Sequence, residues 1–171
     1  DIAQRFDAMP QAFYTDWIGV AREEARHFML LAEHLRTLGH AYGDFPAHNG
    51  LWEMAERTCD DLLARLVMVP MLLEARGLDV SPPLRAKLWS IGDRAGAAIL
   101  DVILRDEVGH VAIGLNWYRW LCTERGLEAL ATVEELRARY GAPPQRGPLN
   151  LEARRKAGFT EPELARLAPS R

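Results

Sequence analysis

The stretch REEARHFMLLAEHL, residues 22–35, decides the fold because its apolar residues recur at helical spacing while some polar residues share their face. Glu24 and His27 are three residues apart and fall on this apolar stripe, whereas Glu23 falls on the polar side. We therefore expect Glu24 and His27 to point into a helical core. The apolar positions of the stripe, spaced by three, four and seven residues, are Trp17, Val20, Ala21, Phe28, Leu31, Leu35 and Leu38.

Two further segments repeat this combination of acidic residues and apolar surroundings. In RDEVGH, residues 105–110, Glu107 and His110 have the same spacing and lie on the apolar stripe of another long helix. In MLLEARG, residues 71–77, Glu74 stands one turn after an apolar face. We expect these three side chains to be buried as well.

Burial of so many ionisable groups is unfavourable unless something compensates their charge. Burial of an ionised carboxylate costs on the order of several kcal/mol of desolvation free energy, unless the group is paired, protonated or bound to a metal. Carboxylate oxygens and imidazole nitrogens suit iron or manganese, and Glu-x-x-His places both ligands on one helix face. The pattern predicts a metal centre. A structural polar network, or helices rotated so that these residues meet solvent, is the alternative.

Apolar spacing of three and four residues predicts helices along the whole chain, with almost no strand signal. Gly39 and Gly77 are predicted C-terminal stops, Pro70 is a predicted kink, and LDVSPP is a predicted turn. The loop over 39–50 is rich in glycine and proline. The expected helices cover residues 1–8, 11–38, 51–76, 84–91, 93–125 and 127–140, and two short tail helices are capped by Asn150 and Thr160.

These elements predict an all-α protein built as an antiparallel four-helix bundle over residues 1–140, with the first helix truncated. Residues 141–171 are expected to form a C-terminal tail whose short helices pack on the bundle. Its bases Arg154, Arg155 and Lys156 are interpreted as a solvated face. A generic helical interaction domain is the alternative fold-level interpretation.

Composition limits the classes of function. The chain has 171 residues, 49% of them hydrophobic, and a net charge of −3 with no basic tract, so we expect no nucleic-acid partner. We expect no signal peptide, and the apolar run over 62–73 is too short to cross a membrane. Cys59 and Cys122 are interpreted as small core residues of a cytoplasmic protein, with a disulfide as the alternative.

The chain resembles the ferritin-like di-iron carboxylate superfamily. The interval from Glu74 to Glu107 is close to that between the single glutamate and the next Glu-x-x-His in the ribonucleotide reductase small subunit and its relatives. A closer resemblance, to an uncharacterised bacterial ferritin-like family, covers nearly the whole chain. The stretches that carry it are EEARHF, HAYGDFPAHNGLWEMA, VPMLLEARGLDVSPP, ILRDEVGHVAIG and PLNLEARRKAGF.

The resemblance implies a site for two iron ions, or for manganese and iron. Its ligands on this chain would be Glu24, His27, Glu74, Glu107 and His110. The superfamily pattern also requires a carboxylate about 30 residues before Glu24, which falls before residue 1, so the site is expected to be incomplete in this sequence.

Two further residues are candidates for a supporting role around the metal. A metal-bound histidine usually donates its other N–H to a carboxylate, and in related di-iron proteins the residue just before the Glu of Glu-x-x-His does this for the opposite histidine. The resemblance therefore implies that Asp106 orients His27. An ion pair with Arg105 is the alternative role for Asp106. His34 is a second candidate for this supporting shell, or else a side chain at a helix interface.

The favoured function is a dimetal oxidoreductase that activates dioxygen or peroxide on a small-molecule substrate and receives electrons from a redox partner. The sequence names neither the substrate nor that partner, and a homodimer is possible. A ferroxidase or iron-handling bundle, and a metal-stabilised structural or interaction module without turnover, are the alternatives.

Overall fold

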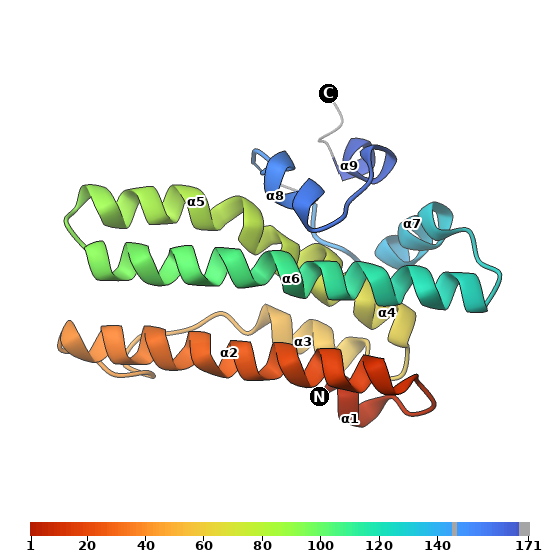
Figure 1. Ribbon diagram of the computed structural model, residues 1–171, viewed down its shortest axis with the longest axis horizontal. Helices are drawn as coiled ribbons and strands as arrows, with labels where there is room; N and C mark the ends of the chain where they lie inside the picture. Colours follow the sequence, from red (N-terminus) through yellow and green to blue (C-terminus); the bar gives the residue numbers. More distant parts are fainter. Residues whose placement is uncertain (145–146, 168–171) are drawn as a thin grey trace. The chain divides into compact units, whose positions relative to one another are not determined.

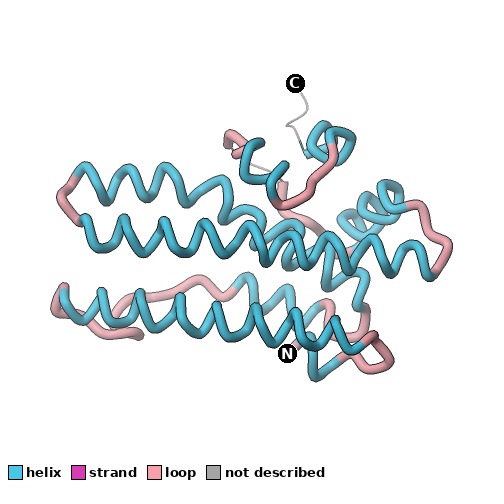
Figure 2. Tube along the Cα trace, viewed as in Figure 1, coloured by secondary structure: helices cyan, strands magenta, loops and turns pink. Residues whose placement is uncertain are grey.

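The computed structural model describes residues 1–144 and 147–167. Within these residues every regular element is a helix and no strand occurs, which confirms the predicted all-α class (Figure 2). No helix in these two ranges combines the length and the apolar character that a membrane span requires. The chain divides into two compact units, each made of two separate segments of sequence.

Unit 1 consists of Asp1–Gly50 and Val80–Asp106. It contains α1 (Ile2–Arg5), α2 (Gln11–Thr37), most of α5 (Ala75–Ser90) and the first part of α6 (Arg94–Glu124). In Figure 1, α5 and α6 lie side by side across a short turn, and Arg85 joins them by donating to both carboxylate oxygens of Asp101. This pair aligns the α5 and α6 segments of the unit.

Helix α2 ends close to its predicted position, at the glycine that the sequence offers. Gly39 adopts a φ of 84°, a left-handed conformation that costs glycine little. The N–H of Gly39 donates to the carbonyl of Arg36, and the N–H of His40 donates to the carbonyl of Leu35. These two bonds form a Schellman motif, which satisfies carbonyls at the helix end that would otherwise lack donors.

One side of α2 differs from the predicted core stripe. Trp17 and Val20 are buried as expected, but Phe28, Leu31 and Leu38 are 48%, 45% and 56% exposed. Ala21 is exposed as well. Spacing alone predicted that all of these residues would be covered, and this is wrong for Ala21 and for the three exposed residues in the second half of the helix.

Unit 2 consists of Leu51–Asp79 and Glu107–Arg171. Its core is centred on side chains with no exposed surface, contributed by the middle of the chain and by the second part of α6: Leu66, Val67, Met68, Val111, Leu115 and Tyr118. Its further elements are α3 (Gly50–Arg57), α4 (Leu62–Leu66), the π-helix η1 (Val67–Glu74), α7 (Ala129–Arg139), α8 (Leu151–Lys156) and α9 (Glu161–Leu167).

The predicted single helix over 51–76 is wrong. The chain breaks over 58–61 and resumes at α4, where Asp61 Oδ1 accepts a hydrogen bond from the N–H of Ala64 at 3.0 Å. This carboxylate is an N-cap, which favours a new helix start at that point. The helix then changes to π geometry in η1, where Pro70 was predicted to produce a kink.

The predicted stop at Gly77 and the turn after it are also wrong, because α5 runs on through Pro82 and Pro83. A proline inside a helix removes the N–H that would bind the carbonyl four residues earlier. For Pro82 that carbonyl belongs to Leu78, and Asn150 Nδ2 donates to it at 3.1 Å. A side chain from the tail therefore replaces the missing helical bond.

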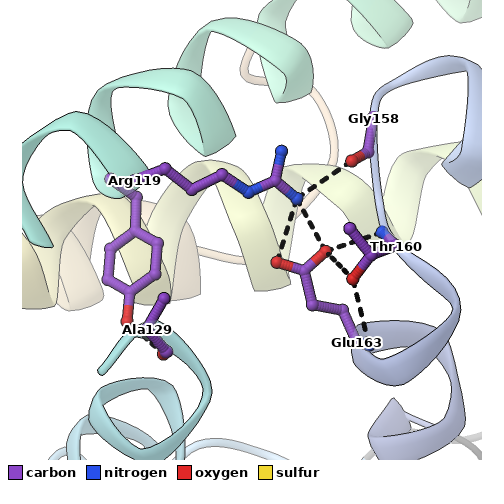
Figure 3. Close-up of polar contacts among 6 residues, drawn as sticks. Arg119, Ala129, Gly158, Thr160 and Glu163 are labelled. Atoms are coloured by element: carbon purple, nitrogen blue, oxygen red, sulfur yellow. Dashed lines mark hydrogen bonds and ion pairs between the residues drawn. The ribbon is translucent and has the colours of Figure 1, made fainter. Parts of the chain in front are cut away.

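Within unit 2 the C-terminal tail is joined to α6 by polar contacts (Figure 3). Arg119 Nη2 donates to both carboxylate oxygens of Glu163, at 2.9 and 2.7 Å, and to the carbonyl of Gly158 at 2.9 Å. Oγ1 of Thr160 accepts from the N–H of Glu163 at 3.4 Å, and Oε2 of Glu163 accepts from the N–H of Thr160 at 2.7 Å. These reciprocal bonds form a capping box, so the predicted cap at Thr160 is confirmed. The predicted cap at Asn150 is confirmed by its bond to the N–H of Ala153.

Candidate metal centre

The first Glu-x-x-His pair lies on α2 in unit 1. His27 is only 4% exposed, as predicted, and its Nδ1 lies 3.5 Å from Oε1 of Glu24. The side chain of Glu24 is 50% exposed, so the prediction that it points fully inward is wrong. The carboxylate instead stands at the edge of the core, with one oxygen beside the buried ring.

Asp106 is placed as predicted, on the other side of the His27 ring. Oδ2 of Asp106 lies 3.1 Å from Nε2 of His27, and Oδ1 accepts from Nε of Arg105 at 2.9 Å. Burial by itself raises the pKa of Asp106, but the hydrogen bonds from His27 and Arg105 outweigh it and hold the pKa below its usual value. Both expected partners of Asp106 are therefore present together.

An ionised Asp106 determines which nitrogen of His27 carries the proton. A carboxylate only accepts, so Nε2 carries the hydrogen and the Nδ1 of a neutral ring keeps its lone pair. That lone pair faces the side of Glu24. Two atoms that bind one ion, each at about 2.1 Å, lie roughly 3 to 3.5 Å from each other. The 3.5 Å spacing between Nδ1 and Oε1 is compatible with such a shared ion.

The second pair lies on α6 in unit 2 and has the same internal geometry. His110 is 1% exposed, and its Nδ1 also lies 3.5 Å from a carboxylate oxygen, Oε2 of Glu107. The side chain of Glu107 is largely buried. The predicted burial of both residues is confirmed, and the two pairs present the same imidazole nitrogen to their glutamates.

Glu74 is the last residue of η1 and is half-buried. The helix around it runs close to α6, because a Cβ added to Gly114 would lie 2.5 Å from Cβ of Pro70. Only a residue without a side chain fits beneath Pro70. Glu74 stands at the end of a π-helical segment, and sequence spacing did not reveal this geometry.

His34 has a partner that the sequence reasoning did not name. Its Nε2 lies 2.9 Å from Oδ2 of Asp93, whose Oδ1 accepts from the N–H of Gly96 at 2.8 Å. Asp93 thereby caps the start of α6 and holds it against α2. The sequence signal for such a cap is an aspartate placed three residues before a helical N–H. The supporting role of His34 near a metal stays a prediction.

The donor set of these residues fits a metal ion in kind. Within each unit it combines imidazole Nδ1 atoms with carboxylate oxygens, which suits divalent first-row metals such as iron and manganese. The ligand assignment for Glu24, His27, Glu74, Glu107 and His110 rests on this chemistry and on the two equal pair geometries. Asp1 pairs with Arg5 on the surface.

Comparison with known proteins places the chain in a family without assigning it an activity. A family model described as a protein of unknown function, DUF455, matches residues 1–165. An uncharacterised protein of Haemophilus influenzae is 52% identical over 153 residues, which is 90% of this chain but 53% of that protein, so the chain spans about half the length of this relative. No solved structure matches. The chain therefore belongs to the DUF455 family.

Proposed function

We propose that the chain is a ferritin-like metal-binding protein whose ligands are Glu24, His27, Glu74, Glu107 and His110. The observation that carries this proposal is the repeated pair geometry, with a buried histidine whose Nδ1 lies 3.5 Å from a glutamate oxygen on both α2 and α6. Ordinary surface helices place glutamate and histidine in water. Both histidine rings are buried, and both turn Nδ1 towards a glutamate oxygen. This similarity favours the same role, metal binding, for both pairs.

The proposed activity is that of an oxidoreductase containing two iron ions, or manganese and iron, which would supply the chemistry of dioxygen or peroxide activation. The chain's own residues have definite roles. Asp106 holds Nε2–H of His27, so that the ring cannot turn its lone pair away from Glu24. The glutamates can bind through one oxygen or two, which lets them follow changes of charge.

An iron-handling role, as in a ferroxidase, is the second candidate, and the exposure of Glu24 favours it. A carboxylate that is half open to solvent, beside a buried imidazole, gives ions a route between water and the site. A tightly closed oxidase would not require this opening. The third candidate, a metal-stabilised module without turnover, predicts bound metal and no consumption of oxygen.

The first experiment measures metal content by elemental analysis of protein purified from cells supplied with iron and manganese. We expect transition metal in the wild type and a loss of at least half of it in His27→Ala and His110→Ala. His40→Ala is the matched control, since His40 lies in the loop after α2 with a half-exposed side chain. Circular dichroism checks that each variant keeps its helices.

The second experiment separates the candidate activities. Oxygen uptake is measured after addition of ferrous iron in small and in large excess. Oxygen uptake that keeps rising in proportion to the added iron indicates iron handling. Oxygen uptake that no longer rises once the site is filled, and then requires an organic reductant, indicates an oxidase. Wild-type metal content in folded Glu107→Ala and His110→Ala would refute the ligand assignment.

A further inference from the structure

Arg154 in α8 is a buried base in a tail that the sequence predicted to be solvated. It has no exposed surface, and its Nε and Nη2 donate to the two carboxylate oxygens of Asp79 at 3.0 and 2.7 Å. Its neighbours Arg155 and Lys156 pair with glutamates at the surface. Of three consecutive bases, one is therefore taken into the interior of unit 2, which corrects the prediction.

Arg154 binds the segment that directly follows Glu74, over residues 75–79. Nη2 of Arg154 also donates to the carbonyl of Ala75, the residue that follows Glu74, at 3.2 Å. Asn150 adds a bond from its N–H to Oδ1 of Asp79, at 2.9 Å. Tail residues thus bind acceptors over 75–79, where the π-helix η1 returns to α geometry.

This segment needs support from outside because its own hydrogen-bond pattern is interrupted. A π-helix is rare and has a less favourable bonding geometry than an α-helix, and the prolines at 70 and 82 lack N–H donors on either side of Glu74. The planar guanidinium of an arginine donates two parallel hydrogen bonds to one carboxylate and so fixes its orientation, which the ammonium of a lysine does not do. The tail therefore restrains the backbone that carries Glu74.

We propose that Arg154, acting through Asp79 and the carbonyl of Ala75, is the positioning residue for the carboxylate of Glu74. The proposal rests on the ligand role of Glu74 given above. Arg154 does not bind the metal. Its role is to hold the end of η1 in the register that presents Glu74, so that a residue 80 positions later in the chain controls how strongly the site holds its ion.

The test uses Arg154→Lys, which keeps the charge beside Asp79 but loses the paired bonds. Cobalt(II) is the probe, since its visible absorption reports coordination, and Arg155→Lys is the matched control because its side chain is exposed. We expect Arg154→Lys to weaken cobalt binding about 10- to 100-fold, as loss of a supporting partner does, and to change the absorption spectrum. Arg155→Lys should match the wild type in both.

A double-mutant cycle distinguishes positioning from general damage. In a Glu74→Gln background, Arg154→Lys should cause little further loss of cobalt affinity, because the ligand that it positions is already absent. If the double variant lost cobalt affinity by the full product of the two single losses, the two residues would act independently and the proposal would be overturned. Asp79→Asn serves as a milder second variant, whose amide oxygen still accepts one bond from Arg154, and it should shift the spectrum in the same direction.

Hydrogen exchange tests the backbone restraint independently of any metal. Amides over 67–79 should exchange faster in Arg154→Lys, while those of α7 exchange as in the wild type. Equal acceleration in both segments, or none over 67–79, would overturn the proposal. If the wild type binds no cobalt, the proposed function fails, and the exchange result alone then decides whether Arg154 restrains η1.

Discussion

At the residue scale, Asp93 shows how one carboxylate can serve two neighbours. It accepts the N–H of Gly96 and pairs with His34, which joins the start of α6 to α2. The pKa of Asp93 lies below its usual value, first because of the bond from Gly96 and then because of His34. A lowered carboxyl pKa means that the folded protein favours the ionised form.

The resulting pH dependence has a definite sign. Since the pKa of Asp93 is lower in the folded protein than in the unfolded chain, where it is about 3.9, its contribution to stability is present above that pH and is lost below it. Asp93→Asn should therefore reduce the free energy of unfolding at pH 6 and flatten its decline towards pH 3. Urea unfolding across this range measures the effect.

Asp7→Asn is the control for this pH prediction, because Asp7 is an exposed aspartate of the same unit. It should leave the pH profile unchanged. A profile for Asp93→Asn that runs parallel to that of the wild type would contradict the assignment.

Residues whose role follows from helical spacing or from the family resemblance were predictable from sequence, and a buried pair without either signal was not. The burial of His27 was predicted from the helical spacing of its stripe, and its contact with Asp106, 79 positions away, was predicted from the resemblance to di-iron proteins. Arg154 was misassigned, because no motif or spacing connects it to its partner Asp79, 75 positions earlier. Nothing in the local sequence separates Arg154 from the exposed Arg155.

At the element scale, η1 explains why helix boundaries between 51 and 90 were misplaced. Apolar spacing locates a helix by the contrast between its two faces. The run LLARLVMVPMLL over 62–73 is apolar on nearly every side. It has no alternation of apolar and polar faces, so a change in the number of residues per turn leaves no trace in the sequence. Long helices with two distinct faces, α2 and α6, were predicted to within about two residues of their observed ends.

Gly114→Ala tests the close approach of α6 to η1. Alanine favours a helix over glycine by about 1 kcal/mol, yet here its Cβ would lie 2.5 Å from Cβ of Pro70. Overpacking of this kind costs about 1–3 kcal/mol, so we expect a net loss of stability in chemical denaturation.

Gly109→Ala in the same helix is the matched control, because a Cβ there would meet nothing within 4 Å. It should raise the free energy of unfolding by a few tenths of a kcal/mol to about 1 kcal/mol. If both variants gained stability alike, the contact with Pro70 would not limit position 114.

At the scale of the whole molecule, the all-α class was predictable because helical spacing runs along the entire chain. The two compact units were not, because each is assembled from two stretches that alternate in sequence: 1–50 with 80–106, and 51–79 with 107–171. A search for linkers along the chain has no boundary to find in such a case. The predicted division at residue 140 stays a prediction.

Removal of the chain from Pro148 onward should be strongly destabilising. It deletes buried Ala153, Ala157, Phe159 and Leu164, and it leaves the carboxylate of Asp79 buried without its arginine. Breaking a buried ion pair from one side alone costs about 3–5 kcal/mol. We expect a markedly lower Tm in thermal unfolding, or no cooperative transition.

The untruncated chain with Arg155→Ala and Glu161→Ala is the control for the truncation. These residues form an exposed pair in the same tail, and their loss should leave the Tm nearly unchanged. A truncated protein that melts with the wild type would show that the tail is dispensable to unit 2.

The contact between Pro70 and Gly114 also has a consequence for how sequences in the family can diverge. A proline ring at position 70 and a side chain at position 114 exclude each other, because both would occupy the same space. A side chain at position 114 is therefore tolerated only after Pro70 has been replaced by a residue that leaves room for it, and proline can return to position 70 only while position 114 is glycine. The residues at positions 70 and 114 are therefore expected to covary within the family, so that proline at 70 occurs together with glycine at 114.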